Sequence, residues 1–159
     1  MGLFGFGKKK SYADGEYQKQ PKISPERELI NEGALLNSDI NLMDGIQFSE
    51  LVRVVLKRLE FSFGQLDLSG DYGADFVVAK NGKKIAIRTM KLTNDTNVGP
   101  EIDKAEKAKL HYKTDEAWLI SSGIFTSKQI TYAQDRVTPI HQSMFSEWLA
   151  KAKQGSTKK

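Results

Sequence analysis

The pair Asn81-Gly82 constrains the fold of this 159-residue chain more than any other feature, because it stands between two apolar runs. The runs cover residues 74–79 and 85–90. Asn and Gly both tolerate the positive φ angles of a two-residue type I′ turn, so the pattern predicts a β-hairpin. The other expected elements are placed around this hairpin.

An amphipathic helix is predicted upstream of the hairpin. Asp44 can cap it, and Gln47 can reach back to complete a capping box. Apolar residues then recur at the i, i+3, i+4 and i+7 positions of a core face. These residues are Phe48, Leu51, Val52, Val55, Leu56 and Leu59.

The remaining elements suggest an α/β fold. Strands are expected at residues 65–68, 74–79, 84–91, 116–121 and 137–140, and helices at 24–36, 101–112, 126–136 and 143–153. The helix over 101–112 lies between two strands, so it can make a parallel crossover, with apolar members Ile102, Ala105, Ala108 and Leu110. This order predicts a mixed central sheet flanked by helices on both sides.

The composition favours an anionic partner and a reducing compartment. The net charge is +4 and the isoelectric point about 9.2. A basic surface attracts polyanions such as nucleic acid, although lysines in the tails can be merely solvated. Cysteine is absent, which excludes disulfides and thiolate metal sites and suits a cytoplasmic protein. No stretch is long and apolar enough to predict stable membrane insertion.

Three regions are expected along the chain. Residues 1–42 are interpreted as a flexible N-terminal arm with a short helix, because glycine, lysine and glutamine dominate their first part. Residues 43–153 are expected to form one domain, a length that suits a single core. Residues 154–159 are expected to be a basic tail.

Several short motifs carry a resemblance to a known family. They are M-D-G-I-Q-F-S from Met43, S-G-D-Y-G-A-D from Ser69 to Asp75, Val98-Gly99, and Phe125-Thr126. In this order they resemble the Mrr-type branch of the PD-(D/E)XK restriction-endonuclease-like superfamily. The resemblance runs from about Met43 to Leu149, which is most of the chain.

The resemblance implies a restriction-endonuclease-like αβββαβ core and magnesium-dependent hydrolysis of DNA. It implies that Asp75 binds the metal, that a Gln or acid on the next strand helps, and that a Lys two residues further orients the attacking water. Asp71 is a candidate second ligand, although an Asp in a glycine-flanked turn is more often a turn former. The implied partner is DNA, and a homodimer is expected because nucleases of this fold often pair.

The second hairpin strand departs from the family pattern. Alignment puts Arg88 at the Gln position and Met90 at the catalytic Lys position. Strand alternation then places both on the face of the site, with Lys91 on the opposite face unless a bulge rotates it. A guanidinium cannot bind magnesium, so Arg88 is hypothesised to pair with Asp75, and the alternative is a solvated Arg88.

Other candidates follow from position. Thr93, Asn94 and Asn97 lie beside the predicted site and can contact a phosphate backbone, or they can form a plain polar loop. His111 and His141 are single histidines, for which structural or surface roles are expected.

Three functions are consistent with these residues. The first is a DNA-binding protein whose nuclease activity is lost or weakened. The second is an active magnesium-dependent DNA endonuclease with a rearranged site that uses Lys91. The third is a non-catalytic protein-interaction module on the nuclease fold.

Overall fold

The computed structural model describes residues 25–93 and 96–157, so residues 1–24 of the arm predicted over residues 1–42, and the last two residues of the chain, lie outside it. The elements are α2 (Pro25–Leu36), η1 (Ile40–Leu42), α3 (Gly45–Arg58), β1 (Ser62–Phe63), β2 (Phe76–Lys80), β3 (Lys83–Met90), α4 (Gly99–Tyr112), β4 (Glu116–Ser121), α5 (Ser127–Ala133), β5 (Thr138–Ile140) and α6 (Gln142–Thr157). The unit that begins at Gly33 carries the site. No helix in the described ranges is long and apolar enough to cross a membrane.

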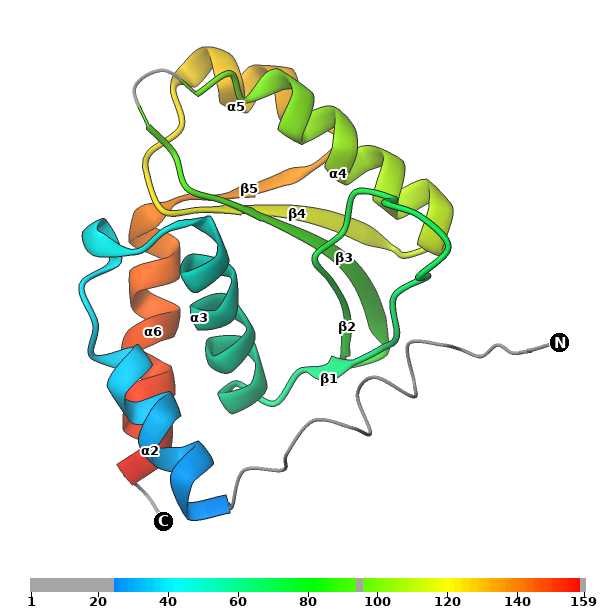
Figure 1. Cartoon of the computed structure of the whole chain (residues 1–159). Coiled ribbons are helices and arrows are strands. Elements are labelled where there is room, and N and C mark those ends of the chain that lie inside the picture. The colour runs from blue at the N-terminus through cyan, green and yellow to red at the C-terminus, as the bar shows by residue number, and fades with distance from the viewer. Residues whose placement is uncertain (1–24, 94–95, 158–159) are drawn as a thin grey trace, which may run out of the picture. The chain divides into compact units, whose positions relative to one another are not determined.

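The five strands form one mixed sheet in the order β1-β2-β3-β4-β5. The first three strands pair antiparallel, whereas β3, β4 and β5 run parallel to one another. Helices α3 and α6 cover one face of the sheet, and α4 and α5 cover the other (Figure 1). The predicted mixed α/β sheet flanked by helices is therefore confirmed.

The hairpin turn has the predicted form. Asn81 and Gly82 have φ angles of 55° and 80°, and Lys80 pairs with Lys83 directly across them. The antiparallel register then brings Phe76 opposite Ile87. This register places the head of β2 beside the C-terminal end of β3.

The two faces of β3 belong to two different cores. Ile85 and Ile87 are buried in the cluster formed with α3 and α6. Met90 is buried in the cluster formed with α4 and α5. Because side chains alternate along a strand, odd-numbered residues of β3 face α3 and even-numbered residues face α4.

The core face of α3 matches the sequence pattern. Asp44 and Gln47 form the predicted capping box. Five of its predicted apolar residues are fully buried, while Leu59 is half-buried and packs against the same cluster. Val54 is also fully buried, which the i, i+3, i+4 pattern did not include.

Three predicted details are wrong. The first strand is Ser62–Phe63 rather than 65–68: the Gly64 N–H still donates to the Val77 carbonyl, and residues 65–68 do not pair with β2. Leu110 is 73% exposed, since it lies more than half a helical turn beyond Ala108. Helix α6 continues to Thr157, into the expected tail.

Gly73 provides a test of how the loop between β1 and β2 packs. Its φ is +94°, and a Cβ there would lie 2.2 Å from the Lys104 carbonyl oxygen of α4. We expect Gly73→Ala to lower the free energy of unfolding by about 2–4 kcal/mol, through strain and overpacking. Chemical denaturation measures this, with Gly45→Ala as the control.

A Cβ at Gly45 meets nothing within 4 Å. That variant should therefore stay within about 0.5 kcal/mol of the parent protein. Equal stabilities for the two variants would contradict the close packing of the loop on α4.

Candidate functional site

Asp75 lies just before β2 and is bound to the end of β3. Its backbone N–H donates to the Ile87 carbonyl over 2.7 Å. Its carboxylate Oδ2 accepts from the Thr89 backbone N–H at 2.7 Å and from the Thr89 hydroxyl at 3.0 Å. The Asp75 carboxylate therefore reaches Thr89, an odd-numbered residue on the face that α3 covers.

Lys91 lies on the same face as Thr89, two residues further along the chain. Its Nζ donates to the Ile40 carbonyl of η1 at 2.9 Å, and its side chain is half-buried. The contact with η1, the element before α3, agrees with this direction. Asp75, Thr89 and Lys91 thus gather at one end of the sheet on one face.

Arg88 and Met90 point to the opposite face. The Arg88 Nε is 2.7 Å from Glu101 Oε1 of α4, and its Nη1 donates to the Gly73 carbonyl over 3.2 Å. Met90 is only 8% exposed and belongs to the apolar cluster with α4. Neither side chain lies on the face that carries the Asp75–Thr89 contact.

The hypothesised pair between Arg88 and Asp75 is therefore wrong. Arg88 pairs with Glu101, and both side chains are largely buried, with 16% and 22% of their surface exposed. The Asp75 carboxylate turns along the strand edge to Thr89 instead. The alternation that separates Lys91 from Arg88 and Met90 is regular.

Glu101 is a structural partner that sequence reasoning missed. It lies in the first turn of α4, and its Oε2 also lies 3.8 Å from Lys104. The signal was an acid at the start of a crossover helix, which must pack on the strands that it connects. The sequence shows no sign of which cation on the sheet that acid meets.

Asp71 adopts the turn role. Its side chain is exposed, and Oδ1 accepts the backbone N–H of Gly73, two residues on, at 3.0 Å. Within the described ranges no three His, Cys, Asp or Glu residues form a group that could hold a metal ion. Asp71 as a second metal ligand stays a proposal without support from this geometry.

The described oxygen ligands around Asp75 do not fit a magnesium ion held by the protein. Magnesium requires near-octahedral oxygen coordination. Here one carboxylate and one hydroxyl are adjacent, and the hydroxyl and a backbone N–H are both directed at the same carboxylate oxygen. Because these contacts occupy Oδ2, we derive no chemical step through a metal at this site.

The loop after β3 is held by its own side chains. Thr93 and Thr96 share a hydrogen bond of 2.7 Å between their hydroxyls, and the Thr93 N–H donates to Thr96. Asn97 accepts the Gly99 N–H at the start of α4. Asn94, also predicted to contact DNA, lies outside the described residues.

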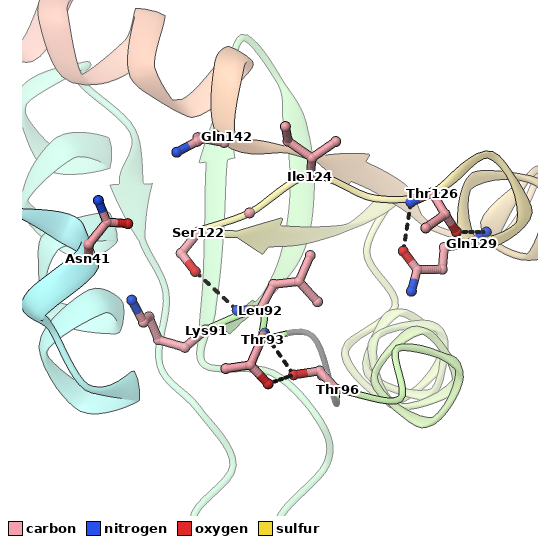
Figure 2. Close-up of a pocket in the computed structure, with 11 residues that line it drawn as sticks. Asn41, Lys91, Leu92, Thr93, Thr96, Ser122, Ile124, Thr126, Gln129 and Gln142 are labelled. Atoms are coloured by element: carbon pink, nitrogen blue, oxygen red, sulfur yellow. Dashed lines mark hydrogen bonds between the residues drawn. The ribbon is translucent and has the colours of Figure 1, made fainter.

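A pocket of about 470 Å³ opens at the C-terminal ends of β3 and β4, beside Lys91 (Figure 2). Its apolar lining is small and comprises Leu92 and Ile124. Its polar side chains are Asn41, Lys91, Thr93, Thr96, Ser122, Thr126, Gln129 and Gln142. Among the residues that the structure describes, this lining contains one cation and no carboxylate, so the pocket favours an anion.

Several donors of the pocket are available. Lys91 uses one N–H group on Ile40, and an ammonium group has others. The side-chain amides of Asn41 and Gln142 make no hydrogen bond to any residue that the structure describes. The Ser122 hydroxyl accepts from Leu92 N–H, which leaves its proton available. Sequence reasoning named Lys91 but missed Asn41, Ser122 and Gln142, because they come from distant segments.

The loop between β1 and β2 is fixed to the end of α4 by an aromatic and polar cluster. Tyr72 stacks on His111 with ring centroids 3.6 Å apart. His111 Nε2 lies 2.9 Å from Asp67 Oδ2, and the Asp67 N–H donates to the Tyr112 hydroxyl. The structural role expected for His111 is what these contacts show.

These observations define the class of the protein. The mixed sheet, with an aspartate at the head of β2 and polar residues at the end of β3, describes a restriction-endonuclease-like α/β domain. The family model for restriction endonucleases of the Mrr catalytic type matches residues 40–149, more than half of the chain. The chain therefore belongs to the Mrr-like restriction endonuclease family. No curated protein and no solved structure matches it.

The ion pair between Arg88 and Glu101 predicts a structural phenotype. Glu101→Gln removes the charge that faces a largely buried guanidinium, and we expect a loss of about 1–3 kcal/mol in unfolding free energy. Thermal and chemical denaturation measure it. Glu147→Gln, an exposed site on α6, is the control and should change stability by less than about 0.5 kcal/mol. A neutral Glu101→Gln variant would contradict the structural assignment of Arg88.

The contact between Asp67 and His111 predicts a pH dependence. Hydrogen bonds from Ser69 and then from His111 lower the pKa of Asp67. A lowered folded-state pKa stabilises the protein above about pH 4, and this contribution disappears as the pH falls through the folded pKa. The stability difference between the parent protein and Asp67→Asn should therefore shrink between neutral pH and pH 3.

Asp135→Asn is the matched control, because Asp135 is exposed and has a positive φ that Asn also tolerates. The change with pH for Asp67→Asn is measured against that of Asp135→Asn. A pH-independent difference for Asp67→Asn would show that its carboxylate does not hold the loop.

Proposed function

We propose that this protein binds DNA at the end of the sheet that carries Asp75, Thr89 and Lys91, and that it hydrolyses DNA weakly or not at all. The observation that carries the proposal is the state of Asp75. Its Oδ2 accepts two hydrogen bonds from Thr89, and no other described carboxylate joins it in a metal-binding group.

DNA binding is supported by the donors beside this site. Lys91, Asn41, Gln142 and Ser122 offer N–H and O–H groups around a pocket whose described lining residues include no carboxylate. Phosphate oxygens are acceptors, and a lysine ammonium binds them as a point charge. The net charge of +4 favours the approach of a polyanion.

Weak hydrolysis is supported by the side chains at the end of β3, beside Asp75. In the family's second strand, the Gln or acid is followed two positions later by Lys. Thr89 and Lys91 have the same spacing. This register is one residue further along than the sequence alignment placed it. A threonine hydroxyl then stands where the family has a Gln or an acid, and this weakens the set of oxygen ligands for a hard cation.

The same placement favours a second candidate, an active magnesium-dependent endonuclease that uses Lys91. Asp75, Thr89 and Lys91 share one face, so the lysine does not need a bulge to reach it. On the resemblance alone, we also keep a homodimer as a proposal. We also propose a cytoplasmic location, because the chain contains no cysteine.

Binding is tested with a labelled duplex in EDTA over a range of salt concentrations. We expect log K to fall linearly with log salt, and Lys91→Ala to reduce the slope by about one, because one phosphate contact is lost. Lys107→Ala, on the exposed surface of α4, is the control and should leave the slope unchanged. Absence of any binding would refute the proposal and favour a protein-interaction module.

Cleavage is tested with supercoiled plasmid in magnesium or manganese. We expect little or no nicking by the parent protein. Robust metal-dependent cutting that Asp75→Ala and Lys91→Ala each abolish would establish the second candidate instead. Both variants should first show the parent circular dichroism spectrum.

A further inference from the structure

The pocket beside Lys91 combines phosphate donors with apolar surface. Ile124 lines it and is 70% exposed. Leu92 lines it too, and its position is constrained, because a Cβ at Gly123 would lie 3.0 Å from its side chain. Leu42, the neighbour of the lining residue Asn41, is 83% exposed. A site that binds only an anion does not require the apolar side chains of Leu92 and Ile124.

The donors come from three separate segments and face the same space. Asn41 belongs to η1, Lys91 follows β3, and Gln142 begins α6. Figure 2 shows these three side chains around one side of the pocket, with Ile124 and Leu92 further along it. One cavity thus offers these donors together with two apolar side chains, and further polar residues complete its lining.

We propose that this pocket takes one unpaired nucleotide of a DNA strand, so that the protein prefers frayed or single-stranded extensions to continuous duplex. The inference rests on the DNA-binding function proposed above. Lys91, Asn41 and Gln142 hold the phosphate. The base lies against Leu92 and Ile124.

The size and chemistry of the pocket support a single nucleotide. Its volume of about 470 Å³ lies in the range of roughly 300–1,000 Å³ typical of small-ligand sites, far below what a duplex occupies. A duplex presents its phosphates outward but covers the faces of its bases by stacking. Only an unstacked base can bury its face on apolar side chains, as in pockets that receive flipped or single-stranded bases.

The lining also argues against the simplest rival, a bare phosphate site. A bare phosphate would satisfy Lys91 and the amides and leave Ile124 in water. Burying that side chain against a base adds a hydrophobic contribution that a phosphate alone cannot supply. A duplex phosphate that passes over the rim would likewise engage Lys91 without Ile124. The contribution of Ile124 therefore separates the three ligands.

The test compares a blunt labelled duplex with the same duplex carrying a short single-stranded extension, both in EDTA, by fluorescence anisotropy. We expect the extended duplex to bind about fivefold more tightly, which corresponds to burying part of one isoleucine side chain. Inorganic phosphate, added as a competitor, should affect both substrates equally.

Two isoleucine variants test whether the pocket causes the preference for the extended duplex. Ile124→Ser should bring the two affinities together. Ile130→Ser, on α5, should keep the preference, because Ile130 is 42% exposed and does not line the pocket. Both sites are on the surface, and circular dichroism checks the folding of both variants.

The outcomes are distinct. Equal affinities of the parent protein for the two substrates would overturn the inference and leave the proposed DNA binding in place. A preference that survives Ile124→Ser would overturn the assignment of the pocket. Failure to bind either substrate would overturn both the inference and the proposed function.

Discussion

The hydrogen bonds from Thr89 to the Asp75 carboxylate define the geometry of the candidate site. They tie the head of β2 to the end of β3 and mark the α3-facing side of β3 as the side of the acid. Strand alternation then places Lys91 with Asp75 and separates Arg88 and Met90 from it. The pocket at the ends of β3 and β4 opens beside this lysine.

The opposite side of β3 is structural. Arg88 is bound by Glu101 and by the Gly73 carbonyl, so one guanidinium joins α4, β3 and the loop before β2. The stack of Tyr72 on His111 fixes the same loop to the far end of α4. Arg88, which departs from the family's catalytic pattern on β3, therefore stabilises the fold.

Most of the fold could be predicted from the sequence, because local signals mark it. Asn81-Gly82, the Asp44 capping box and the apolar run of β4 are patterns of neighbouring residues. The site could be predicted only in part. A one-residue change of register on β3 exchanges its two faces, and no local pattern distinguishes Arg88 from Thr89 as the partner of Asp75. The pocket was not predictable, since Asn41, Lys91 and Gln142 are far apart in the chain.

The central claim is that, among the residues the structure describes, Asp75 lacks the oxygen partners needed to hold a divalent ion. Titration of the ¹⁵N-labelled protein with Mn²⁺ tests it directly, because the paramagnetic ion broadens the amide signals of residues around its site. The account predicts no selective, saturable broadening at Asp75 and Thr89 at micromolar Mn²⁺. Selective broadening there that Asp75→Asn abolishes would contradict it.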